Sequence, residues 1–350
     1  MRLHLLVTLA LLGCANVPTA PSETPAAVTA EEMTGLWVLQ IRRQEWQPRD
    51  LEFVLRIEPG GDGTATLDPV LIGRTTARLV ELAADGDRIR FWLHSRMDDH
   101  DYRFDARRDG GTLDGVVRWH DGKVEHTEPF TGHRREVRRF DTEIARFPVE
   151  EDPRKVGVEP VLLDRLVLGA EAARSDGLLV LADGRLVAAR TFGNEDAPTS
   201  VGTLSAAIAE LAGGQPDVPN GLRLRPSELA ALGQALLDGG EWMGERAVPE
   251  RWMETLAVPA ADAAPSPGAG WSIQPDPTDE ARAPLGFGHV TEAGEGLLFY
   301  PEARLVVVRT MHRVENRYDR RYDRRDEMGW LDEMAEAIAV EKLGRLPPGE

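Results

Sequence analysis

Residues 34–133 consist of short segments in which apolar and polar side chains alternate, and most of these segments are separated by turns that contain glycine. The clearest segment is 51–58, in which apolar and charged side chains take turns: Leu51, Phe53, Leu55 and Ile57 against Glu52, Arg56 and Glu58. A period of two residues is typical of a strand with one buried face. The rhythm predicts an antiparallel meander that closes into a barrel or packs as a small sandwich.

We expect seven or eight strands in this region, at residues 35–41, 51–58, 64–67, 74–82, 88–93, 101–106, 112–119 and 123–131. Together with the opening Gly35-x-Trp37, the rhythm resembles the lipocalin-like β-domains that accompany some hydrolases. The resemblance implies an antiparallel β-barrel over residues 31–139. A closed barrel of about eight strands either holds one small ligand or is filled by its own side chains. Both outcomes stay open here, and a small apolar ligand is one candidate partner.

Charge and cysteine content narrow the function classes. The formal net charge of −18 argues against a nucleic-acid partner, because phosphate backbones are bound by clustered cations. Cys14 is the only cysteine, so no disulfide can form within the chain and burial of apolar surface must hold the fold together.

The surroundings of Cys14 predict where the protein is located. Arg2 precedes an apolar run that ends in Leu11-Leu12-Gly13-Cys14. As a helix, residues 3–12 cover about 15 Å, roughly half a bilayer core, which suits a signal peptide rather than a permanent span. The simpler interpretation is an ordinary signal peptide with an incidental cysteine, or a cysteine that is buried in the core.

The same segment resembles the lipobox of bacterial lipoproteins. The resemblance implies that residues 1–13 are removed, that Cys14 is acylated, and that the membrane is a partner through this lipidated residue. Residues 14–30, rich in Pro, Ala and Thr, then form a flexible tether. Ala15 stands where an inner-membrane retention signal places Asp, so we expect an outer-membrane lipoprotein that faces the periplasm.

After a charged connector at residues 140–159, the pattern changes to mixed helices and strands. Helical spacing predicts helices at residues 161–173, 200–211, 226–237, 249–256 and 326–343. Strands are expected at residues 178–181, 185–191, 269–273, 295–300 and 305–310, the first two joined by Ala182-Asp183-Gly184. This order predicts an α/β unit whose antiparallel sheet is covered on its faces.

The second unit resembles the serine β-lactamase and penicillin-binding-protein superfamily, especially its class C-like esterase branch. The matching pieces, in order, are Asp176-Gly177-Leu178-Leu179-Val180, Asp183-Gly184-Arg185-Leu186-Val187, Thr191-Phe192-Gly193, Ser200-Val201, Leu222-Arg223-Leu224-Arg225-Pro226, residues 232–240, Val248-Pro249-Glu250-Arg251-Trp252, Gly270-Trp271, Gly286-Phe287-Gly288-His289, Tyr300-Pro301-Glu302 and residues 305–308. The resemblance implies a truncated β-lactamase-like domain over residues 160–345, with a reduced helical subdomain.

Catalysis in that superfamily needs Ser-x-x-Lys at the start of a helix, where one turn places the amine beside the hydroxyl. The best match is Ser200-Val201-Gly202-Thr203, and threonine cannot serve as the base. The chain has three lysines, Lys123, Lys155 and Lys342, and none follows a serine by three positions. Arginine cannot replace the lysine, because it stays protonated.

The other catalytic elements are also incomplete. Asn220 reads as a turn residue rather than as part of a second motif, because only a short segment separates residue 211 from residue 222. His289-Val290-Thr291 only partly matches Lys/His-x-Gly, and a loop histidine is the simpler interpretation. The sequence therefore predicts no catalytic residue, with Ser200 and His289 as vestigial candidates and Ser200 acting as a helix N-cap.

Three other clusters have structural explanations. The first, Asp98-Asp99-His100-Asp101, suits a solvated turn better than a cation site. The second is the tandem repeat Tyr318-Asp319-Arg320-Arg321 and Tyr322-Asp323-Arg324-Arg325, which suits an ion-paired helix start better than a protein contact.

The third cluster is a pair of histidines, His120 and His126, which flank Asp121-Gly122. A two-residue hairpin there pairs His120 with Lys123 and His126 with Val117, which puts the histidines on opposite faces. We expect no metal and no cofactor.

These observations predict a non-catalytic, lipid-anchored envelope protein that acts by binding or assembly, with an envelope protein or a peptidoglycan-related molecule as partner. Two alternatives stay open. One is an active serine hydrolase acting on esters or peptidoglycan-like amides, and the other is a carrier that holds a small apolar molecule in the barrel.

Overall fold

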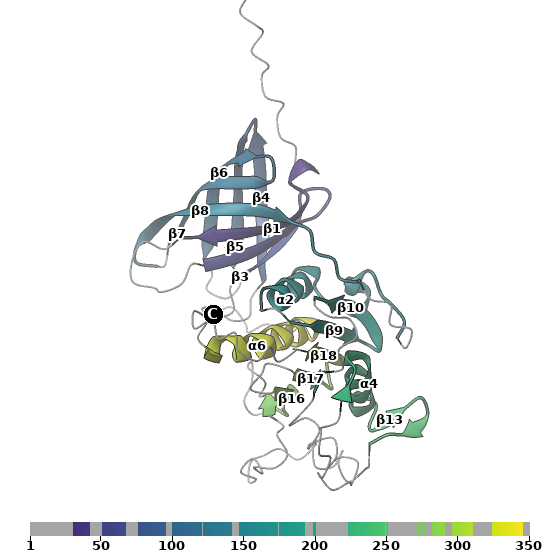
Figure 1. Ribbon diagram of the computed structural model, residues 1–350. Helices are drawn as coiled ribbons and strands as arrows, with labels where there is room; N and C mark the ends of the chain where they lie inside the picture. The colour runs from purple at the N-terminus through teal and green to yellow at the C-terminus, as the bar shows by residue number, and fades with distance from the viewer. Residues whose placement is uncertain are drawn as a thin grey trace, which may run out of the picture.

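The computed structural model contains two units, a β-barrel and a separate antiparallel sheet flanked by helices (Figure 1). The structure describes residues 31–42, 51–67, 76–95, 100–120, 122–141, 147–173, 175–192, 199–200, 223–248, 250, 272–274, 276, 282–290, 296–310 and 324–345. Several residues of the sequence analysis lie outside this set: Cys14, Asp98, Asp99, Thr203, Asn220 and most of the tandem Tyr-Asp-Arg-Arg repeat. Of the expected helices at 200–211 and 249–256, only Ser200 and Glu250 are described.

The first unit is a closed barrel of eight antiparallel strands in chain order, β1 (Gly35–Ile41), β2 (Leu51–Ile57), β3 (Gly63–Leu67), β4 (Thr76–Asp85), β5 (Arg88–Ser95), β6 (Asp101–Asp109), β7 (Thr112–His120) and β8 (Glu125–Arg135). β1 pairs with both β2 and β8, which closes the barrel; Leu39, for example, lies opposite Phe53 on one side and Gly132 on the other. The predicted meander is confirmed, and it forms a barrel rather than a sandwich.

Aromatic side chains fill the described interior of the barrel. Phe91 stacks on Phe104 with ring centroids 4.4 Å apart, and Phe130 meets Phe104 edge to face at 5.0 Å. The short helix η1 (Glu31–Met33) adds the buried side chain of Met33, and the Trp37 indole donates a hydrogen bond of 2.8 Å to its carbonyl. Of the two outcomes open to a small barrel, these contacts favour the filled one.

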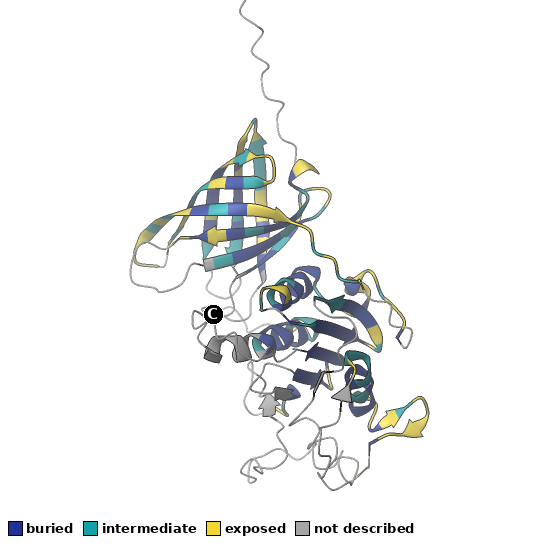
Figure 2. Cartoon of the chain, in the orientation of Figure 1, coloured by how far each residue is buried: buried dark blue, intermediate teal, exposed yellow. Residues whose placement is uncertain are grey.

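The second unit is a six-stranded antiparallel sheet with the order β10-β9-β18-β17-β16-β15. Its strands are β9 (Gly177–Ala182), β10 (Arg185–Thr191), β15 (Ser272–Gln274), β16 (Gly286–Val290), β17 (Gly296–Tyr300) and β18 (Leu305–Thr310). β9, β17 and β18 are buried along their whole length, as Figure 2 shows for the centre of the sheet.

Helices cover both faces of this sheet. α2 (Pro160–Ala172) and α6 (Arg324–Lys342) share one apolar cluster with Leu178 and Val180 of β9. α4 (Pro226–Leu237) shares another with Leu179 and Leu181 of the same strand. Because neighbouring residues of a strand point to opposite faces, a continuous apolar run is what a sheet covered on both sides requires. Counted over the described residues, the chain is mostly β with few helices.

Two features of this unit were absent from our sequence analysis. β16 is a strand, although its sequence Gly286-Phe287-Gly288 has a low strand propensity. Packing overrides propensity here, because a Cβ atom at position 286 would lie 2.4 Å from Cδ1 of Tyr300 and only glycine fits. The second feature is a small hairpin after α4, formed by β13 (Glu241–Trp242) and β14 (Glu245–Arg246).

Two hairpin turns of the second unit have the same backbone conformation but different residues. Asp183 and Gly184, which join β9 to β10, have φ values of 50° and 73°. Met243 and Gly244, which join β13 to β14, have φ values of 54° and 84°. Positive φ at both central residues defines a type I′ turn, for which Asn, Asp and Gly are favoured at the first position. Met243 is therefore strained, and its side chain is 87% exposed with little packing to compensate.

We expect Met243→Asn to stabilise the fold by about 0.5–1 kcal/mol, because asparagine tolerates the left-handed conformation better than other non-glycine residues. Urea unfolding followed by circular dichroism measures the change. Met243→Ala is the matched control, since it removes the same exposed side chain without relieving the backbone, and it should leave stability almost unchanged. Equal gains from both variants would contradict this explanation.

Candidate functional site

The seam between the two units begins with an apolar contact. Leu36 of β1 and Val54 of β2 form a small buried cluster with Val161 of α2. These barrel residues point outward, since their neighbours Trp37 and Phe53 belong to the interior. The outer wall of the barrel therefore packs directly on the first helix of the second unit.

A buried carboxylate lies beside this apolar contact. Asp164 of α2 has no exposed surface, and its Oδ2 accepts a hydrogen bond of 2.8 Å from Nε of Arg56 in β2. Its Oδ1 accepts a second bond of 2.8 Å from Nε of Arg139, which follows the last barrel strand. One carboxylate thus joins the barrel, the connector and the second unit.

Further polar contacts continue the seam. Arg154 donates a bond of 2.7 Å to Glu58 at the end of β2, and this hydrogen bond raises the pKa of Arg154 above its ordinary value. The Thr64 hydroxyl donates to Glu159 over 3.2 Å. Such exposed contacts contribute little individually, but together they fix the orientation of one unit on the other.

The described part of the connector lies against the second unit. Phe140 and Val149 form isolated parallel bridges with Ala189 and Leu186 of β10. Phe147 is buried in the same apolar cluster as α4. The connector therefore covers the edge of the sheet at β10 instead of spanning open solvent.

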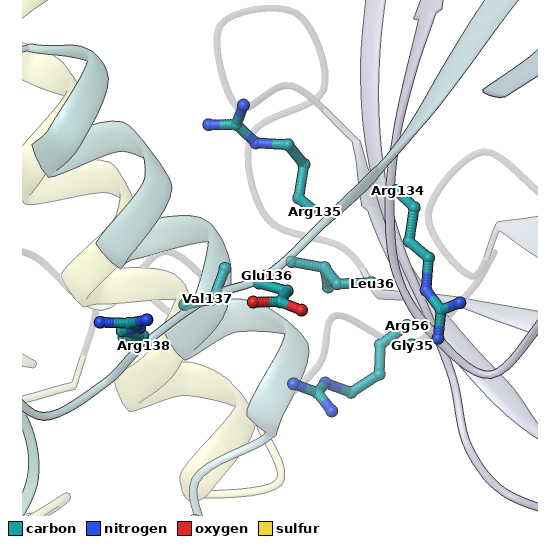
Figure 3. Close-up of a pocket in the computed structure, with 8 residues that line it drawn as sticks. All are labelled: Gly35, Leu36, Arg56, Arg134, Arg135, Glu136, Val137 and Arg138. Carbon is teal, nitrogen blue, oxygen red and sulfur yellow. The ribbon is translucent and has the colours of Figure 1, made fainter. Parts of the chain in front are cut away.

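A pocket of about 600 Å³ opens at this seam and is rich in arginine (Figure 3). Its walls come from the start of β1, from β2 and from the chain that leaves β8: Gly35, Leu36, Arg56, Arg134, Arg135, Glu136, Val137 and Arg138. Figure 3 shows the Glu136 carboxylate near the centre of the view, with the guanidinium groups spread around it.

The pocket arginines differ in their partners. Arg56 is held by Asp164, and Arg134 donates to the backbone carbonyl of Thr34 over 2.6 Å. Arg135 and Arg138 are exposed; Arg135 lies 4.0 Å from Glu171, and Arg138 has no ion-pair partner in the part of the chain that the structure describes. The arrangement suits recognition of an anionic group, since guanidinium groups bind oxyanions through paired donors.

The two vestigial catalytic candidates lie on strands. Ser200 is in β11 (Thr199–Ser200), which pairs with β12 (Arg223–Leu224), so its own backbone is extended. His289 is in β16 and lies opposite Leu297 of β17, so the expectation that it belongs to a loop is wrong. The strand is hard to recognise in the sequence because glycine has a low strand propensity.

Two of the three lysines have clear structural partners. Lys342 Nζ donates to the Val156 carbonyl over 2.6 Å and to Asp183 over 2.8 Å, which fastens α6 to the turn between β9 and β10. Lys155 donates to Glu150 over 3.3 Å. Both amines thus serve ion pairs within the fold.

The paired histidines lie on opposite faces, as predicted, but the predicted register is wrong. His120 pairs with Glu125, and His126 pairs with Trp119, which leaves residues 121–124 between the strands. The His120 ring accepts a bond of 2.9 Å from the Gly122 amide, which stabilises this longer loop. Within the described ranges, no three His, Cys, Asp or Glu side chains gather as a metal site would require.

No protein-family model matches this chain, and no curated protein matches it. Among the helices that the structure describes, none has both the length and the apolar character needed to cross a bilayer.

The arginine-lined pocket was missed by our sequence analysis. Its signal was visible as Arg134-Arg135 and Arg138-Arg139 around Glu136-Val137, at the end of the last barrel strand and just after it. The contributions of Gly35 and Arg56 could not be found in this way, because they come from positions far away in the chain.

We expect Asp164→Asn to destabilise the protein by roughly 2–4 kcal/mol, because it leaves two partly buried guanidinium groups without their charged partner. Thermal and urea unfolding measure the loss. The control is Asp114→Asn, at an exposed position of β7, which should have almost no effect. Equal stability of the Asp164 variant and the parent would show that the seam does not depend on this carboxylate.

Proposed function

We propose that this chain is a non-catalytic, lipid-anchored protein of the bacterial cell envelope, derived from the serine β-lactamase and penicillin-binding superfamily, that acts by binding or assembly. The observation that carries the proposal is Thr203, which stands three positions after Ser200 where the chemistry needs a lysine. A serine hydroxyl is a poor nucleophile at neutral pH without a positioned base.

The fold of the second unit supports the family relationship. An antiparallel sheet with helices on both faces is the arrangement that the resemblance implies. The two lysines whose partners are known, Lys155 and Lys342, are engaged in ion pairs with Glu150 and Asp183, which supports the absence of a catalytic amine.

One observation favours an active hydrolase as the second candidate function. His289 lies on β16, and a strand is where the resemblance places the Lys/His-x-Gly element. The match stays partial, because Thr291 replaces the glycine. The carrier function receives less support, since the described interior of the barrel is packed with aromatic side chains.

The lack of acyl-enzyme chemistry can be tested directly. We expect no covalent adduct at Ser200 when the protein is treated with a fluorophosphonate or a fluorescent penicillin, because threonine stands at position 203, where the superfamily has the lysine that accepts the hydroxyl proton. Intact-mass spectrometry followed by peptide mapping is the measurement, and Ser200→Ala is the control. A mass increase on Ser200 that disappears in the alanine variant would restore the hydrolase assignment.

The anchor is tested by fractionation of cells. Each buried methylene contributes about 0.8 kcal/mol to membrane binding, so several acyl chains on Cys14 hold the protein on the membrane almost permanently. Cys14→Ser should therefore move the protein from the membrane fraction to the soluble fraction. Thr8→Ser, which leaves the cysteine in place, should fractionate like the parent. Membrane retention of the Cys14 variant would argue against a lipoprotein.

A further inference from the structure

The arginine-lined pocket concentrates positive charge in a strongly acidic protein. The chain has a formal net charge of −18, yet four arginines occur within six residues at the end of the barrel, at positions 134, 135, 138 and 139. Folding brings Arg56 to the same place. Guanidinium groups at short range repel one another, so a cluster of this kind is favourable only when anions compensate it.

The described anions compensate the cluster only in part. Asp164 is a single negative charge shared by Arg56 and Arg139. The partner of Arg134 is a neutral carbonyl group, and Arg135 is at the distance limit of an ion pair with Glu171. Glu136 is the one carboxylate among the residues that line the pocket. The pocket therefore keeps a positive charge that solvent or a ligand must neutralise.

A second pocket, of about 540 Å³ between β6, β7 and β8, shows that such an excess is not a general property of the surface. Two arginines, Arg103 and Arg118, and two acidic residues, Asp101 and Glu125, line its walls, so their formal charges balance. Its Trp119 ring is also stacked against His126 with the centroids 4.9 Å apart, which leaves less of the ring available to a ligand.

We propose that the arginine-lined pocket is a binding site for an oxyanion, the phosphate or carboxylate group of a small molecule or of a lipid headgroup. Arg135 and Arg138 supply the exposed donors, Arg134 and Arg56 line the opposite side, and the negative charge of Glu136 opposes the binding of an anion. The site contains no residue of the Ser200 region. The proposal is therefore independent of whether Ser200 reacts as a nucleophile.

Titration calorimetry with inorganic pyrophosphate at low ionic strength tests the site, using the chain from residue 15 onward, which retains every residue that the structure describes. We expect saturable binding that weakens as salt is added. Arg135→Ala and Arg138→Ala should each raise Kd about tenfold, as expected for a lost charge-assisted hydrogen bond. Arg107→Ala removes an equal charge from an exposed position of β6 and should leave Kd within about twofold.

Glu136→Gln provides a test in the opposite direction. It removes this negative charge while keeping the size of the side chain, so pyrophosphate should bind several-fold more tightly. Because it predicts a gain, this result cannot come from loss of fold. Failure to bind pyrophosphate, or binding that none of the pocket substitutions changes, would overturn the assignment.

Sedimentation with vesicles identifies the source of the oxyanion. Binding to phosphatidylglycerol vesicles but not to phosphatidylcholine vesicles, lost in Arg135→Ala and Arg138→Ala, assigns the site to a lipid headgroup. Pyrophosphate binding without vesicle binding assigns it to a soluble ligand. Vesicle binding that survives both substitutions would place the lipid contact elsewhere and count against the pocket.

Discussion

The contact between Asp164 and its two arginines organises the molecule. A carboxylate without solvent exposure is costly unless charged donors surround it, and here the donors come from β2 of the barrel and from the connector. Neither unit alone supplies both of the guanidinium groups that donate hydrogen bonds to Asp164. Once the two units are joined, the chain that leaves β8 must run beside α2. Arg134 and Arg135 at the end of β8, together with Arg138 on this path, then lie around one pocket.

The barrel contributes to this arrangement through its outer surface. Its described interior is occupied by stacked and edge-to-face aromatic rings, which makes it a rigid support. Leu36, Val54 and Arg56 face outward on neighbouring strands, where two apolar contacts lie next to a charge. The functional surface that we propose therefore lies on the wall of the barrel, whereas our sequence analysis considered only its interior.

The features that could be predicted from the sequence depend on local patterns. The alternation in residues 51–58 and the Asp-Gly turns predict individual strands, and a meander needs no further information because each strand pairs with the next.

The second sheet is different, because β9 lies beside β18, more than 120 residues away in sequence, and no local pattern reveals that neighbour. The strand β16 was not predicted because its sequence contains two glycines, which have a low strand propensity. The hairpin between β7 and β8 has a longer loop than the two-residue turn expected for Asp121-Gly122, and the hydrogen bond from the Gly122 amide to the His120 ring lies within that loop. The pocket depends on such long-range contacts, so only its run of arginines at residues 134–139 can be recognised from the sequence.

The packing of the second unit shows which residues hold its sheet together. Its described core consists of apolar side chains from β9, β17 and β18 that alternate between α2 and α6 on one face and α4 on the other. Phe287, two residues before His289 on β16, also belongs to the cluster with α4. Binding at the seam, in turn, draws on the barrel and the connector. The buried side chains of these two clusters include none of the residues that line the pocket, so the charges of the pocket can vary without loss of the sheet's core.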